Sequence, residues 1–364
     1  MSASSETRQS SFAERHRWWP IAKKLLTYAF FIMVVVLLVA LAKKVDWDEV
    51  ITTLRAYSMK TLLLAGLATL GSYLVYTSFD LLGKRYTRHS LPASQILPVT
   101  FVCYAFNLNL SAWVGGIAFR YRLYSRLGLK NSVITQIFTL SLMTNWLGYM
   151  ALGGTVFALG WVKMPESWSI GTGTLRLIGV LLVAVTLIYL GLCAFSKRRS
   201  WTIRGHEIGL PSLRMAASQL VVGGCNWGLM ALVVYIMLQD KVDYPTVLGV
   251  LLISSIAGVV THIPAGLGVL ETVFVTLLQG QVSKGSMLAA LIGYRVLYFL
   301  IPLLLASLVY LLLESQAKKL RNMNSDKQAG SSSPVTFRPA GAPPGGMPLR
   351  FVEMSPNPAS LVGH

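Results

Sequence analysis

Long runs of apolar residues restrict the possible folds of this chain more than any other feature. Of its 364 residues, 54% are hydrophobic and only 13% are charged, which is typical of membrane proteins. A backbone that crosses a bilayer must satisfy its own hydrogen bonds, so each spanning run is expected to be helical. The sequence predicts an all-α membrane protein with about six spanning helices. The expected spans are residues 25–42, 61–82, 132–160, 174–195, 212–238 and 286–313.

A further apolar segment, residues 246–280, is interrupted at its centre. Pro264 has no amide hydrogen, and Gly266 and Gly268 tolerate positive φ, so a continuous helix is not expected here. Broken backbone at this depth of a membrane is tolerated only where protein buries it or where it lines a wet cavity. We therefore interpret the segment as a re-entrant hairpin. Its expected helical halves are 246–261 and 269–280.

Ionisable side chains lie beside this break. His262 and Glu271 flank it, and Arg295 lies about nine residues, or roughly 14 Å, inside the last apolar run. An unpaired arginine at this depth costs on the order of 3 kcal/mol or more. The nearest carboxylate in the sequence is that of Glu271, so we predict a Glu271–Arg295 pair. The pair can either lock the hairpin or take part in transport, and His262 can either relay a proton or serve packing.

A second broken segment, residues 94–118, carries the other candidate binding groups. Its polar and small residues are Asn107, Asn109, Ser111, Gly115 and Gly116. They can bind a polar ligand, or they can cap the ends of broken helices. Arg120 and Arg122 follow at the expected exit of the hairpin. A guanidinium suits bidentate phosphate binding, although a solvated cationic loop would have the same composition.

Two spans contain an Asn-Trp pair, Asn145–Trp146 and Asn226–Trp227. Asn145 is a further candidate binding residue. Hydrogen bonding and packing between helices account for such pairs equally well.

Signatures of soluble enzymes are weak in this sequence. We find no P-loop, dinucleotide fingerprint or metal-ligand cluster, so we expect no metal, no cofactor and no conventional catalytic domain. An integral-membrane transferase would need a carboxylate base, which only Asp80 or Glu271 could supply. Asp80 lies near Lys84 and Arg85, where the sequence favours a surface ion pair.

The distribution of lysine and arginine predicts the topology. With both broken segments re-entrant, the inner side holds 21 of these cations and the outer side 7, whereas two spanning segments would give 14 and 14. The positive-inside rule favours the first arrangement, with both termini cytoplasmic. The net charge of +18 is then explained by anionic lipid rather than nucleic acid. The expected parts are a basic N-terminus (1–24), two halves that can form an inverted repeat (25–160 and 174–313), and a disordered tail (322–364).

Several motifs resemble a known family. They are NLNLSAWVGGIAFRYRLYSRLGL at 107–129, TNWLGY at 144–149, SSIAGVVTHIPAGLGVLE at 254–271 and YRVLY at 294–298. The chain resembles YbhN-type bacterial inner-membrane proteins of the lysylphosphatidylglycerol synthase transmembrane-region family over residues 17–321. The resemblance implies a multi-pass inner-membrane protein. Relatives move aminoacylated phospholipid between leaflets and add a cytosolic aminoacyl-transfer domain, which we do not expect here.

These observations predict a flippase-like protein that translocates a phospholipid or a related anionic lipid, without synthase activity. Membrane phospholipids are its expected partners. Two alternatives stay open: a membrane scaffold that binds a lipid-synthesising enzyme, and a transferase that acts on a lipid carrier. The head group, the direction of movement, the coupling ion and the oligomeric state are not specified by the sequence.

Overall fold

A computed structural model describes residues 47–110, 116–162, 164, 171–196, 200–203, 206–261 and 263–315. The basic N-terminus, the first expected span at 25–42 and the expected tail at 322–364 lie outside these ranges. The described residues all belong to one compact unit, which ends at Ser315.

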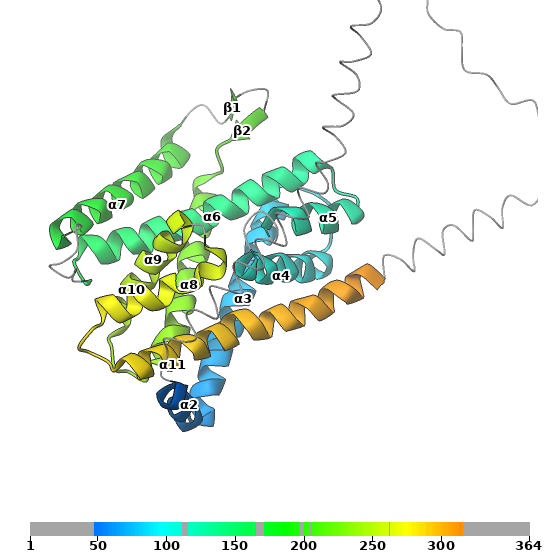
Figure 1. Ribbon diagram of the computed structural model, residues 1–364. Helices are drawn as coiled ribbons and strands as arrows, with labels where there is room; N and C mark the ends of the chain where they lie inside the picture. The colour runs from blue at the N-terminus through cyan, green and yellow to red at the C-terminus, as the bar shows by residue number, and fades with distance from the viewer. Residues whose placement is uncertain are drawn as a thin grey trace, which may run out of the picture. The chain divides into compact units, whose positions relative to one another are not determined.

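The described part of the chain is helical, as predicted (Figure 1). The exception among the described residues is an antiparallel pair of four-residue strands, β1 (Ser200–Ile203) and β2 (His206–Gly209), in the loop before α8. The helices are α2 (Trp47–Ala56), α3 (Met59–Thr87), α4 (Ala93–Asn109), α5 (Phe119–Arg126), α6 (Asn131–Ala158), α7 (Thr172–Phe195), α8 (Leu213–Met237), α9 (Tyr244–Thr261), α10 (Val269–Leu277) and α11 (Lys284–Arg295). After α11 the chain continues through a π turn, η3 (Val296–Leu300), and remains helical to Ser315.

Serine side chains begin three of the long helices. The hydroxyl oxygen of Ser58 accepts a hydrogen bond from the amide of Thr61 at 3.1 Å, and Ser212 caps α8 in the same way. Ser283 does so for α11. Each cap satisfies an amide that has no partner within the helix, and it fixes where the apolar run becomes helical.

Five helices in the described ranges are long and apolar enough to cross a membrane. They are α3, α7, α8, α9 and the continuous helix Lys284–Ser315. The predicted span at 132–160 forms helix α6, which is not among these five. The helices thus form where the apolar runs predict them, and the number of helices that span stays a prediction.

The helices repeat one pattern of neighbours. Helices α3 and α5 each pack against both α4 and α6, and α8 and α10 each pack against both α9 and α11. The two helices that hold the same place in these sets, α3 and α8, also pack against each other (Figure 1). The predicted division into two similar halves stays a prediction, as does the inversion of one half across the bilayer.

Glycines allow α6 to pack closely against its neighbours. A Cβ atom on Gly148 of α6 would lie only 2.1 Å from the carbonyl carbon of Gly223 in α8. A Cβ atom on Gly179 of α7 would lie 2.3 Å from the amide nitrogen of Ala158. At both crossings the backbones are in direct contact, as small residues permit in membrane helices.

Candidate functional site

The predicted break in the apolar segment 246–280 is present. Helix α9 ends at Thr261 and α10 begins at Val269, as the positions of proline and glycine predicted. Between the two helices, Ala265, Gly266 and Gly268 have φ angles of 53°, 56° and 78°. These left-handed conformations stop helical hydrogen bonding. Helices α9 and α10 pack against each other on either side of the break, as the arms of a hairpin do.

Arg295 holds this break together from α11. Its Nη1 donates to the carbonyl oxygen of Ala265 at 3.1 Å, and its Nη2 donates to that of Gly266, also at 3.1 Å. The break leaves these carbonyls without helical partners, and the planar guanidinium can reach two of them at once. A single side chain from the next helix therefore satisfies the interrupted backbone.

Glu271 completes the arrangement, so the predicted pairing is confirmed. Arg295 Nε lies 2.5 Å from Glu271 Oε1, and Arg295 Nη2 donates to Glu271 Oε2 at 3.1 Å. Glu271 Oε2 also accepts the amide of Gly268 at 2.9 Å, which caps α10. The side chains of Arg295 and Glu271 remain 14% and 19% exposed, respectively. We call Glu271, Arg295 and the backbone of 265–268 the clamp. In the clamp the positive charge of Arg295 is balanced by the negative charge of Glu271, and both side chains stay partly exposed.

The π turn η3 starts directly after Arg295 and connects the clamp to the first broken segment. Asn109, at the end of α4, donates from Nδ2 to the carbonyl oxygen of Phe299 at 3.2 Å and to that of Ala105 at 2.8 Å. The Phe299 ring centre lies 5.6 Å from the Arg295 guanidinium. The first broken segment therefore contacts the π turn, and the arginine just before that turn contacts the second broken segment. Turns of this kind recur at functional sites.

Asn107 and Gly116 lie together in the first segment. A Cβ atom on Gly116 would lie 3.0 Å from Asn107 Oδ1, so the glycine makes room for the amide. Ser111, Gly115 and His262 lie outside the described residues, as does the side chain of Pro264.

The expected surface pair of Asp80 with Lys84 or Arg85 is wrong. Asp80 has no exposed area and binds Arg120, which is 2% exposed. Arg120 Nη2 donates to Asp80 Oδ1 at 2.7 Å, and Arg120 Nε donates to Asp80 Oδ2 at 3.1 Å. The partners of Asp80 come from α5 and not from its own helix.

Two more side chains complete this buried group. The Tyr124 hydroxyl donates to Asp80 Oδ2 at 2.8 Å, and Arg120 Nη2 donates to the Ser141 hydroxyl at 3.2 Å. Arg120 was predicted at the exit of the hairpin, either as an anion-binding group or as part of a solvated cationic loop. In the structure its donors are occupied and its side chain is shielded, because a buried arginine requires a carboxylate partner.

Arg122 does lie at the surface. It is 52% exposed and donates to Glu314 at 3.2 Å, and its guanidinium lies 5.8 Å from the ring centre of Tyr310. Arg126 also pairs with Glu314. The sequence reading did not identify Glu314, which lies far from both arginines in the chain.

The Asn-Trp pairs connect two helices, as the packing interpretation predicted. Trp227 Nε1 donates to the carbonyl oxygen of Asn145 at 3.2 Å, so the side chain of Asn145 takes no part in this contact. Asn226 is buried and accepts a hydrogen bond from the Ser72 hydroxyl at 3.0 Å.

A buried group of hydroxyls surrounds Asn226. The hydroxyl oxygen of Tyr298, in η3, lies 2.6 Å from that of Ser72 and 2.8 Å from that of Tyr104. Tyr73 donates to the Tyr298 carbonyl oxygen at 3.0 Å. This network joins α3, α4, α8 and η3. The sequence analysis missed it, because tyrosines within apolar runs carry no distinctive spacing.

Comparisons with known proteins agree with this architecture. The family model for the lysylphosphatidylglycerol synthase TM region matches residues 25–306. The chain is 53% identical over 313 residues to the inner membrane protein YbhN of Escherichia coli, covering 86% of this chain and 98% of that protein. It is 28% identical to a Synechocystis protein described as uncharacterized, covering 78% of this chain and 89% of that protein. The chain is therefore a multi-pass inner-membrane protein that belongs to the lysylphosphatidylglycerol synthase TM region family.

Proposed function

We propose that this protein translocates a phospholipid, or a related anionic lipid, between the leaflets of the inner membrane. The clamp at the α9–α10 break is the observation that supports this function best. It puts a guanidinium, a carboxylate and irregular backbone inside an apolar segment. Broken helices that meet charged groups near the midplane are a recurring feature of transporters.

The surroundings of the clamp suit a lipid substrate. Val259 and Val260, in the last turn of α9, are 56% and 69% exposed and present apolar surface beside the break. A lipid can keep its acyl chains against such a surface while its head group follows the polar backbone. Translocation is slow in a pure bilayer because the charged head group must enter hydrocarbon, and a polar path lowers that cost.

Arg295 is the group proposed to contact the phosphate. In the structure its donors face Glu271 and two carbonyls, so a phosphate must replace Glu271 for part of the cycle. Both anions bind a guanidinium in bidentate fashion. Exchange of one for the other leaves Arg295 paired throughout. The displaced Glu271 side chain, which is 19% exposed, then takes up a proton or turns towards water.

A dye-labelled phosphatidylglycerol in proteoliposomes tests the function. Dithionite destroys the label in the outer leaflet, and the slow phase then reports movement of lipid from the inner leaflet. We expect the protein to speed this phase, and we expect Arg295→Lys and Glu271→Gln to slow it roughly tenfold or more. Lys241→Gln, in the exposed turn before α9, serves as the matched control.

The possible outcomes of this assay lead to different conclusions. Movement no faster than in protein-free liposomes would reject the proposed function. Normal movement in both clamp variants would assign the pair a structural role alone. Gel filtration of each variant separates loss of folding from loss of transport.

The proposed orientation places both termini in the cytoplasm. Under this orientation, cysteines introduced at 119–131 react with a membrane-impermeant maleimide only from the inner side. Labelling of intact cells at these positions would instead reject the re-entrant arrangement.

A further inference from the structure

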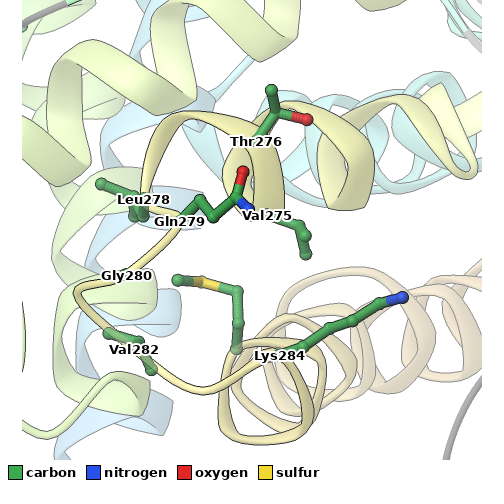
Figure 2. A pocket seen from close by; sticks show the side chains of 8 residues that line it. Val275, Thr276, Leu278, Gln279, Gly280, Val282 and Lys284 are labelled. Carbon is green, nitrogen blue, oxygen red and sulfur yellow. The ribbon is translucent and has the colours of Figure 1, made fainter. Parts of the chain in front are cut away.

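A pocket lies at the C-terminal end of α10, and the clamp lies at the other end of this helix. The pocket has a volume of about 380 Å³ and is formed by α10, the following turn and the start of α11 (Figure 2). Its lining residues are Val275, Thr276, Leu278, Gln279, Gly280, Val282, Lys284 and Met287. A volume near the lower end of known ligand sites suits a head group rather than a whole lipid.

The lining divides into an apolar wall and a polar rim. Leu278, Val282 and Met287 provide apolar surface, and Met287 is almost fully buried at 1% exposure. Gln279 and Lys284 supply an amide and an ammonium group. The lining includes no carboxylate, and Lys284 forms no ion pair with any of the residues described in the structure. The charge of the pocket is therefore positive.

The position of Lys284 strengthens this charge. It is the first residue of α11, directly after the cap residue Ser283. The amides of a first helical turn point out of the helix and favour an anion nearby. The exposed lysine and the helix amides suit an anionic group, and the apolar wall beside them suits a hydrocarbon chain.

The pocket and the clamp also lie along one face of α11. Lys284 and Arg295 are separated by three helical turns, or roughly 16 Å, and this separation returns both side chains to the same side of the helix. Helix α10 packs on α11 and carries Glu271 at one end and Val275 to Leu277 near the other. The contact between α10 and α11 therefore runs from the pocket to the clamp.

We propose that this pocket binds the phosphate of an anionic glycerophospholipid, with Lys284 as its cation and the apolar wall against the upper acyl chain. This inference rests on the proposed function only for the later movement of the lipid. Binding in the pocket is a separate property that can be measured without transport.

Titration of the detergent-purified protein with short-chain phosphatidylglycerol, followed by native mass spectrometry, tests the site. We expect Lys284→Met to weaken binding roughly tenfold, as loss of a charged hydrogen bond predicts. Lys241→Met removes an exposed lysine that does not line the pocket, and it should bind as the unaltered protein does. Met287→Trp should also weaken binding, because the larger side chain fills the pocket without changing its charge.

Two further arms separate lipid from free anion. Glycerol phosphate supplies the phosphate without acyl chains and should bind far more weakly than the lipid. Equal binding of the two would reject a lipid site, and equal lipid binding by the Lys284 and Lys241 variants would reject the pocket. Intact binding with no translocation by the unaltered protein would reject the proposed function and leave this site in place.

Discussion

The guanidinium of Arg120 donates to both carboxylate oxygens of Asp80 in the interior of the protein, 40 residues away in sequence. This pair ties α5, the short helix after the first broken segment, to the long helix α3. We infer that it sets the position of α5, because two buried charges tolerate only a narrow range of geometries.

Asp80→Asn should therefore lower the free energy of unfolding by about 3–5 kcal/mol, because it leaves a buried cation without its counter-charge. Thermal unfolding in detergent measures the loss. Glu314→Gln, which removes the exposed partner of Arg122 and Arg126, should leave the midpoint almost unchanged. Equal effects of the two changes would contradict a special role for the buried pair.

Gly148→Ala should separate α6 from α8. The new methyl group would lie 2.1 Å from backbone of Gly223, so one helix must shift, and we expect a cost of roughly 1–3 kcal/mol or more. Gly191→Ala in α7 is the control, because nothing lies within 4 Å of its Cβ position. Chemical unfolding curves of the two variants test the contrast. Equal stabilities would mean that the crossing is looser than described.

Tyr298→Phe should weaken the buried hydroxyl network. Ser72 and Tyr104 would lose their shared partner but keep their hydrogen bonds with Asn226, so we expect a cost of about 0.5–1.5 kcal/mol. Tyr121→Phe, at a hydrogen bond with Thr135 near the surface, provides the comparison and should cost far less. A thermal-shift assay distinguishes them, and an unaffected Tyr298 variant would show that the hydrogen bonds with Asn226 are sufficient to hold Ser72 and Tyr104.

His89, in the loop after α3, predicts a dependence of stability on pH. Burial, and secondarily Lys84, lowers the pKa of His89, and its Nδ1 accepts the amide of Leu91 at 3.3 Å. The folded state thus prefers the neutral ring. Stability should be complete above about pH 6.5, the ordinary pKa of histidine, and should fall as the pH drops towards the lowered value. Melting curves from pH 5 to 8 should show this trend, and His89→Gln should reduce it.

The break between α9 and α10 could be predicted from the sequence because local chemistry determines it. Pro264 and the glycines after it cannot continue a helix, and the observed ends at Thr261 and Val269 follow from that alone. The Glu271–Arg295 pair was equally predictable. A charge in an apolar segment needs a partner, and one carboxylate was near in sequence.

The Asp80–Arg120 pair could not be predicted in this way. Lys84 and Arg85 offered simpler partners on the same helix, and the sequence contains no spacing signal for the contact between α3 and α5. The hydroxyl network around Tyr298 was missed for a related reason. Its members come from four separate elements, and each looks like an ordinary polar residue of an apolar helix until packing brings them together.

The π turn at 296–300 also determines in which direction the side chains of the helical residues after it point. One additional residue in a turn rotates the remaining helix by about 100° relative to an uninterrupted one. That rotation decides on which side of the helical residues 301–315 Tyr310 and Glu314 lie, and in the structure both face α5. The irregular turn beside the clamp thus determines the direction of a surface contact some four helical turns away. The extra residue within one turn of the helix Lys284–Ser315 therefore links the clamp near its start to the contact with α5 near its end.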